Sequence, residues 1–382
     1  LIFVGVRIGI ALAIAGVAGY SQLNGFGPTL ALLGSVPFEI AYNYDLSIIA
    51  LFVLMGNFAM VSGMSRDLYA MARSLVGHWP GGLASATVVG CAGFAAVSGS
   101  SLASAVTMGR VALPEMERYN YSPRLATGCV AAGGTLGILI PPSTGFIIYA
   151  LLTEESIGQL FLAGVLPGIL LTALFMLTIA LMTRRDPEIG PAAPRMNWAE
   201  RRQSLARSVW LIGIVVVVLG GIYVGVFTPV EAAAIGAFLT FILTLLRKKL
   251  SFDTLKFCTI ETIKTFAMVY LIVIGAFLFS PFLALTEIPK NLAVFVGGLG
   301  LAPLVVLLLI VLGYIILGTF LEGIAIMVLS IPIVFPMILD LGFDPIWFGA
   351  LLVVVLEMSL ICPPLGLNVF VVKGIAEGVP MS

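Results

Sequence analysis

The chain has 382 residues, of which 60% are hydrophobic and only 10% are charged, and its 19 Lys and Arg residues balance its 19 Asp and Glu residues. Soluble domains carry roughly 25% charged residues, so this composition excludes an ordinary soluble domain. The neutral net charge and the absence of a basic domain or RNA-binding motif argue against a nucleic-acid partner. We therefore expect an all-α polytopic membrane protein that lies in the lipid bilayer.

Many apolar segments approach the roughly 20 residues that span a bilayer as a helix. In the first half, the segments predicted to cross or enter the membrane lie at 7–20, before 59–64, around Ser100, and from Leu125 to Glu154 with a break at Pro141 and Pro142. After these, the predicted segments lie at 157–182, 209–226, 229–246, 266–285 and around Glu322. Thr228 and Glu231 form a predicted capping box at the start of one of these helices. Ser122 with Pro123, and Asp344 with Pro345, are predicted to start the two broken helices in the same way. Asn57 is expected to bond to a neighbouring helix.

The charged residues predict the orientation. If the helix that ends at 59–64 reaches the cytoplasm, Lys290 is the only basic residue placed outside, and several acidic residues also fall outside. This asymmetry follows the positive-inside rule. The segment 184–208 carries six arginines and three prolines. We interpret it as a cytoplasmic linker and membrane anchor, with a short surface helix from Asn197.

The chain repeats one pattern: a polar, glycine-containing tip is followed by a proline-broken membrane segment. The prolines of the two copies pair at a constant offset of 222 residues: Pro114, Pro123, Pro141 and Pro142 with Pro336, Pro345, Pro363 and Pro364. The predicted topology makes the first tip enter from the cytoplasm and the second from the opposite face. The sequence therefore predicts two inverted repeats, each with a re-entrant helical hairpin and a proline-broken transmembrane helix, as in secondary transporters.

The first tip, 98–101, reads Ser-Gly-Ser-Ser, and the first break covers 137–144. Glycine and proline free backbone carbonyls and amides, which membrane depth tolerates only beside protein or a watery cavity. The oxygens suit a hard monovalent cation, and the helix N-termini suit an anion. A simpler alternative is that small residues only let the helices pack closely.

The second tip contains Thr319 and Glu322, and the second break runs from Ser359 to Asn368. An ionisable residue within the bilayer is a functional candidate. Three roles stay open for Glu322: a cation ligand, a proton carrier, or a helix cap. Glu357 ranks below it, because nothing polar sits beside it in the sequence.

Other chemistries find little support. The four cysteines are scattered, the single histidine lies in an interfacial-looking segment, and no ATP-binding P-loop occurs. We expect no enzyme activity, no resident cofactor and no metal beyond coupling ions. An intramembrane enzyme, the remote alternative, lacks a reactive residue pair.

Long motifs carry a family resemblance: SGSSLASAVTMGRVALPEMERYNYSPRLATG with GILIPPSTGFIIYALLTEESIGQLFLAGVLPGIL in the first half, and GTFLEGIAIMVLSIPIVFPMILDLGFDPIWFG with CPPLGLNVFVVKGIA in the second. They resemble the large membrane subunit (DctM-like) of the tripartite ATP-independent periplasmic (TRAP) transporters, over nearly the whole chain. Members of that family begin earlier and continue for one more helix. We therefore expect this sequence to be the central part of a longer chain, separate from or fused to the small subunit.

The resemblance implies an elevator-type carrier in the bacterial inner membrane. Residues 80–153 and 303–382 would form the mobile transport domain, and residues 1–79 and 154–302, with the linker 184–208, would form the scaffold. The implied partners are a four-helix small membrane subunit, a periplasmic substrate-binding protein and a small organic acid, with uptake driven by sodium. A stand-alone dicarboxylate or citrate carrier of the same superfamily is the alternative.

The resemblance also implies three sets of site residues. The first sodium site would contain Ser98, Gly99, Ser100, Ser101, Gly137 and Pro141. The second would contain Thr319, Glu322, Gly323, Pro363, Gly366 and Asn368. Substrate would contact Ser100, Ser104, Ser143, Thr144 and Asn368. Members of the family often carry aspartate at the position of Glu322, so this chain departs from the family pattern by one methylene group in that side chain.

Overall fold

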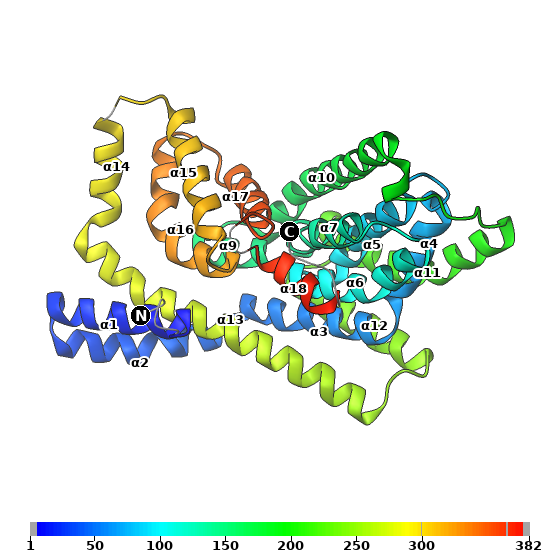
Figure 1. Ribbon diagram of the computed structural model, residues 1–382. Coiled ribbons are helices and arrows are strands. Elements are labelled where there is room, and N and C mark those ends of the chain that lie inside the picture. Colours follow the sequence, from blue (N-terminus) through cyan, green and yellow to red (C-terminus); the bar gives the residue numbers. More distant parts are fainter. Residues whose placement is uncertain (1–5, 299, 364–365, 377–382) are drawn as a thin grey trace.

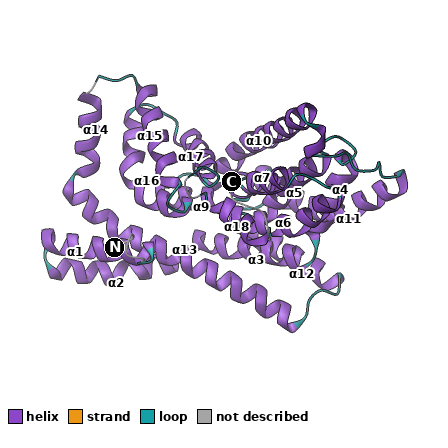
Figure 2. Ribbon diagram, viewed as in Figure 1, coloured by secondary structure: helices purple, strands orange, loops and turns teal. Residues whose placement is uncertain are grey.

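A computed structural model describes residues 6–298, 300–363 and 366–376, and all regular structure in these ranges is helical (Figures 1 and 2). Seven helical stretches of the described chain are long and apolar enough to cross a membrane. The expected class, an all-α polytopic membrane protein, is therefore confirmed.

The first half contains three helices, then a polar helix, a helical hairpin, a broken helix and a long final helix. Its elements are α1 (Ile8–Asn24), α2 (Phe26–Tyr42), η2 (Tyr44–Leu46), α3 (Ser47–Val61), α4 (Met64–Val76), α5 (Gly82–Ser98), α6 (Ser101–Arg118), α7 (Pro123–Gly134), α8 (Leu136–Leu139), α9 (Thr144–Thr153), α10 (Ile157–Arg185) and η3 (Pro187–Ile189). The pair α5 and α6 forms the hairpin, and α7 to α9 form one helix interrupted at Pro141 and Pro142.

The second half repeats the order of hairpin and broken helix. Its elements are α11 (Trp198–Tyr223), α12 (Pro229–Leu246), α13 (Phe252–Thr286), α14 (Ile288–Gly298), α15 (Pro303–Gly318), α16 (Gly323–Asp340), α17 (Pro345–Ser359) and α18 (Leu367–Ile375). Here α15 and α16 form the hairpin, and α17 and α18 are the two parts of the broken helix. Pro364, which belongs to the proline register, lies outside the described residues.

Several local sequence signals act as expected. Pro123 and Pro345 are the first residues of α7 and α17, because proline lacks the amide that a first helical turn leaves unbonded. The Asp344 carboxylate accepts a hydrogen bond from the Trp347 amide and caps α17. The predicted capping box at Thr228 forms at the start of α12.

Other expectations need correction. The segment from Asn197 is no separate surface helix: α11 continues without interruption into the predicted span. The capping box of Asn197 and Glu200 starts this helix, and nothing between Trp198 and Tyr223 ends it. Three helices were not expected: α2 contains an internal proline, α4 is strongly amphipathic with little overall hydrophobicity, and α14 is a short helix before the second hairpin.

Long helices of the first half pack against long helices of the second half. Helix α1 packs along α13, and α12 packs along α3. Glycines make this close approach possible: a Cβ atom on Gly9 or Gly16 would collide with the α13 backbone, and one on Gly236 would lie 2.5 Å from the Met55 sulfur. Figure 1 shows α1 lying beside α13.

One part of each broken helix also packs against the opposite half of the chain. Helix α9, from the first half, packs against α16 and α17 of the second half. Helix α18, from the second half, packs against α6 and α7 of the first half. Helix α10 packs against α5, α8, α9 and α17, so it lies with the hairpins and broken helices.

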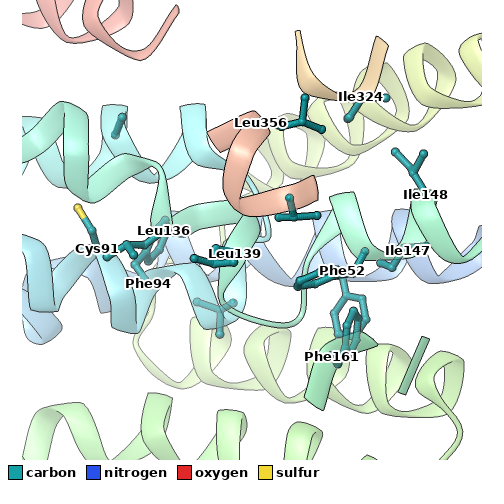
Figure 3. Packing of buried hydrophobic residues seen from close by; sticks show 14 of the residues in the cluster. Phe52, Cys91, Phe94, Leu136, Leu139, Ile147, Ile148, Phe161, Ile324 and Leu356 are labelled. Carbon is teal, nitrogen blue, oxygen red and sulfur yellow. The ribbon is translucent and has the colours of Figure 1, made fainter. Parts of the chain in front are cut away.

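Buried aromatic and aliphatic side chains fill the space behind the first break. Phe52 on α3 and Phe161 on α10 meet edge to face, with ring centroids 6.1 Å apart. Leu136 and Leu139 of α8 are fully buried near them (Figure 3). This packing holds the short helix α8 in place between its longer neighbours, and thereby holds the first break.

Candidate functional site

The first tip lies directly against the first break, as the sequence predicted. The Thr144 hydroxyl donates a hydrogen bond of 2.8 Å to the Gly99 carbonyl. Gly99 has a φ of 58°, a left-handed conformation that glycine adopts without steric cost. A Cβ atom on Gly137 would lie 2.5 Å from the Ser100 carbonyl oxygen, so two backbones meet here. The buried residue Pro141 follows α8 in the same break.

The hydroxyl groups around the first tip have different surroundings. Ser98 and Ser104 share a hydrogen bond of 2.8 Å, and both are buried. Ser100 is the N-cap of α6, with its Oγ 3.4 Å from the Ala103 amide. Ser143, predicted to contact substrate, is fully buried, and its hydroxyl caps α9.

The second tip is built differently. Glu322 occupies the N-cap position of α16, but its side chain makes no capping hydrogen bond. The capping role considered for Glu322 is therefore absent in this structure. The Thr319 hydroxyl donates to the Ile316 carbonyl of its own helix, at 2.8 Å. Gly318 packs directly against Ser359 of α17, so the second tip also lies beside its broken helix.

The second break places its predicted residues less tightly. Pro363 is exposed, and Gly366 takes a left-handed conformation with a φ of 57°. Asn368 is fully buried, and its Nδ2 lies 3.4 Å from the Ala131 carbonyl of α7. The amide of Asn368 is thus placed against the first half of the chain.

A cavity of about 260 Å³ lies between the two tips and helices α3, α13 and α17. Six of the predicted site residues line it: Ser98, Ser100, Ser101, Thr144, Glu322 and Gly323. The remaining predicted residues are not among those that line it: Gly99, Ser104, Gly137, Pro141, Ser143, Thr319, Pro363, Gly366 and Asn368. The structure therefore brings both tips to one hollow.

The polar lining of this cavity is acidic and hydroxylic. It comprises Asn57, Ser98, Ser100, Ser101, Thr107, Thr144, Thr265, Glu322 and Glu357. Among the described lining residues none is Lys, Arg or His. Oxygen ligands of this kind favour a cation over a free anion. The expected bond from Asn57 to a neighbouring helix is present, at 3.0 Å to the Thr262 hydroxyl of α13.

The reason for ranking Glu357 below Glu322, that nothing polar sits beside it, does not hold in the structure. The Glu357 Oε2 accepts a hydrogen bond of 2.6 Å from the Ser101 hydroxyl, and the residue is only 3% exposed. Its polar neighbour, Ser101, is 256 positions away in the sequence, so the residues next to Glu357 in the chain do not reveal this contact. The available signal was an ionisable residue in an apolar helix, which by itself marks a functional candidate.

The fold is that of a known transporter. The crystal structure of the Alcanivorax borkumensis YdaH transporter superposes with a TM-score of 0.71, covering 98% of this chain and 92% of the other at 16% sequence identity. At this identity the likeness shows the fold alone. The class is a polytopic membrane protein with the fold of that transporter.

Sequence comparisons give the family. Residues 1–382 match the DctM component of the tripartite ATP-independent periplasmic transporters. The C4-dicarboxylate large permease protein DctM of Pseudomonas aeruginosa is 39% identical over 369 residues, which is 96% of this chain and 86% of that protein. The sialic acid large permease protein SiaM of Vibrio cholerae is 32% identical, over 99% of this chain and 88% of that protein. The chain belongs to the DctM family of TRAP transporter large permeases and is an inner-membrane protein.

Proposed function

We propose that this chain carries a small organic acid into the cell together with sodium ions, as the transport subunit of a binding-protein-dependent TRAP system. The observation that carries the proposal is the cavity between the two tips. It has two carboxyl groups and many hydroxyls but, among the described residues, no basic side chain. A carboxylate substrate would be repelled by this lining unless cations bind with it.

We assign the sodium ions to the two tips. The first site would use the tip and break that the Thr144 bond joins, namely Ser98, Gly99, Ser100, Ser101, Gly137 and Pro141. The second would use Thr319, Glu322 and Gly323 with Pro363, Gly366 and Asn368 of the second break. The lack of a capping bond leaves the Glu322 carboxylate available as a ligand. Substrate would enter the same cavity beside Ser100 and Thr144.

The reciprocal packing supports an inverted-repeat transport mechanism. Helix α9 packs into the second half and α18 into the first, which is the exchange that a pseudo-two-fold axis produces. The two hairpins and broken helices would then move together as the transport domain of an elevator. Helix α10 packs against them, so we assign it to this moving part and not to the scaffold of residues 154–302.

The family supports the proposed partners. Two relatives are named for C4-dicarboxylates and for sialic acid, so we propose a small carboxylate as substrate here. A small membrane subunit and a periplasmic binding protein would complete the system. Screening the cognate binding protein by thermal shift against a panel of organic acids would identify the substrate.

Reconstitution tests the proposal. The chain is placed in liposomes with its small subunit, and uptake of the labelled acid is measured with binding protein outside. We expect uptake with an inward sodium gradient and none when potassium replaces sodium. Equal uptake in potassium would reject sodium coupling. Uptake without any binding protein would favour a stand-alone carrier of the same superfamily.

A further inference from the structure

One hydrogen bond joins the first hairpin tip to the second broken helix. The Ser101 hydroxyl, on the first turn of α6, donates to Glu357 on α17. Both residues are buried, with exposures of 2% and 3%. The oxygen–oxygen distance of 2.6 Å is in the range of short, strong O–H···O bonds to carboxylates.

The Glu357 carboxyl group has no other side-chain partner among the described residues. In the part of the chain that the structure describes, Ser101 is the one side chain that bonds to its carboxyl group, and no ion pair includes it. A buried carboxyl group is costly unless it is hydrogen-bonded. This bond therefore stabilises one arrangement of the two halves, in which α17 lies against the tip.

The other hydrogen bonds and the closest backbone contact of the first tip come from its own half. Thr144 bonds to the Gly99 carbonyl, and Gly137 packs against the backbone of Ser100. Only the Glu357 bond brings in a side chain of the second half at this tip, among the hydrogen bonds of the described residues. It is thus a direct hydrogen-bonded link between α17 and the first tip.

We propose that Glu357 is a positioning residue that makes the geometry of the first tip depend on the second half of the chain. By holding the Ser101 hydroxyl, it keeps the first turn of α6 in the arrangement that binds an ion. The two halves are then coupled, because losing the bond to α17 removes this support from the tip. The nature of the ion rests on the proposed function, but the coupling itself does not.

Hydrogen–deuterium exchange tests the link without any transport assay. The reconstituted complex is compared with its Glu357→Ala, Ser101→Ala and double variants, and exchange is followed in peptides covering residues 98–104. Loss of one such bond predicts about tenfold faster exchange. The double variant should exchange no faster than either single variant, since all three lack the same bond. Glu117→Ala, an exposed change on the same helix α6, is the control and should leave exchange unchanged.

Sodium activation gives the second readout. Glu357→Ala should raise the sodium concentration for half-maximal uptake about tenfold, whereas Glu357→Gln, whose amide oxygen still accepts from Ser101, should stay within about threefold of the native protein. Unchanged tip exchange in Glu357→Ala, additive effects in the double variant, or equal loss in the Gln and Ala variants would overturn the link. A native protein that transports without sodium would instead reject the proposed function, and the exchange experiment would still decide the link.

Discussion

Replacing Gly137 by alanine puts a methyl group where the first tip meets the first break. The added Cβ atom would lie 2.5 Å from the Ser100 carbonyl oxygen and 2.7 Å from the Ser101 Cα atom. Real Cβ contacts essentially never fall below 3.0 Å, so the two backbones must separate by about 0.5 Å (3.0 − 2.5). Backbone atoms cannot rotate away as a flexible side chain can. Overpacking of this kind costs about 1–3 kcal/mol.

The same displacement reaches the proposed sodium site. Binding groups must stay within about 0.5 Å of their productive geometry. The separation of the two backbones is as large as this limit, so the site should bind its ion more weakly. We expect Gly137→Ala to raise the half-maximal sodium concentration about tenfold or more. Gly128→Ala is the matched control, because it lies on α7 and a Cβ atom there meets nothing within 4 Å. It should keep native sodium activation.

Uptake in liposomes at a series of sodium concentrations, beside thermal unfolding of both variants, measures the effect. A fall in melting temperature with altered sodium activation only in the Gly137 variant would support the reasoning. Identical sodium curves for the Gly137 and Gly128 variants would refute it, since the tip and break would then not form an ion site.

Three further predictions address topology, tip closure and the second site. Cysteines at Glu154 and Lys290 should react with an impermeant maleimide from the periplasm, and one at Arg195 only after permeabilisation, because of the charge asymmetry. Thr144→Val removes a buried hydrogen bond to the first tip and should cost about 1–3 kcal/mol in the free energy of unfolding, with weaker sodium activation. Glu322→Gln should raise the half-maximal sodium concentration while the protein still folds, because a neutral amide is a poorer cation ligand than a carboxylate.

Each of these has a contrary outcome. The reverse labelling pattern would invert the topology. A Thr144 variant with native stability would show that its bond does not hold the tip. A Glu322 variant that loses its pH dependence but keeps native sodium activation would make this residue a proton carrier.

The sequence anticipated features that local chemistry controls. Proline fixes helix starts and breaks, so Pro123 and Pro345 begin helices where predicted. The placement of the first tip beside the first break was implied by the family resemblance, which puts residues of both in one sodium site. The sequence did not predict helix α4, because its mixed polar and apolar residues form no long apolar segment.

The sequence does not predict the contacts between the two halves. The bond from Ser101 to Glu357 and the contact of Asn368 with Ala131 depend on how distant helices pack. Neither residue type nor spacing predicts which helix of one half will meet which helix of the other. For the same reason the continuous course of α11 through the linker could not be inferred from its charges alone.

Sodium flux measured together with substrate tests the central claim most directly. Liposomes with the chain, its small subunit and the loaded binding protein outside are supplied with radioactive sodium, and its entry is followed before and after the acid is added. The account predicts that substrate starts sodium entry in a fixed ratio to acid uptake, and that the Gly137→Ala variant reduces both together. Acid uptake with no accompanying sodium entry would contradict it.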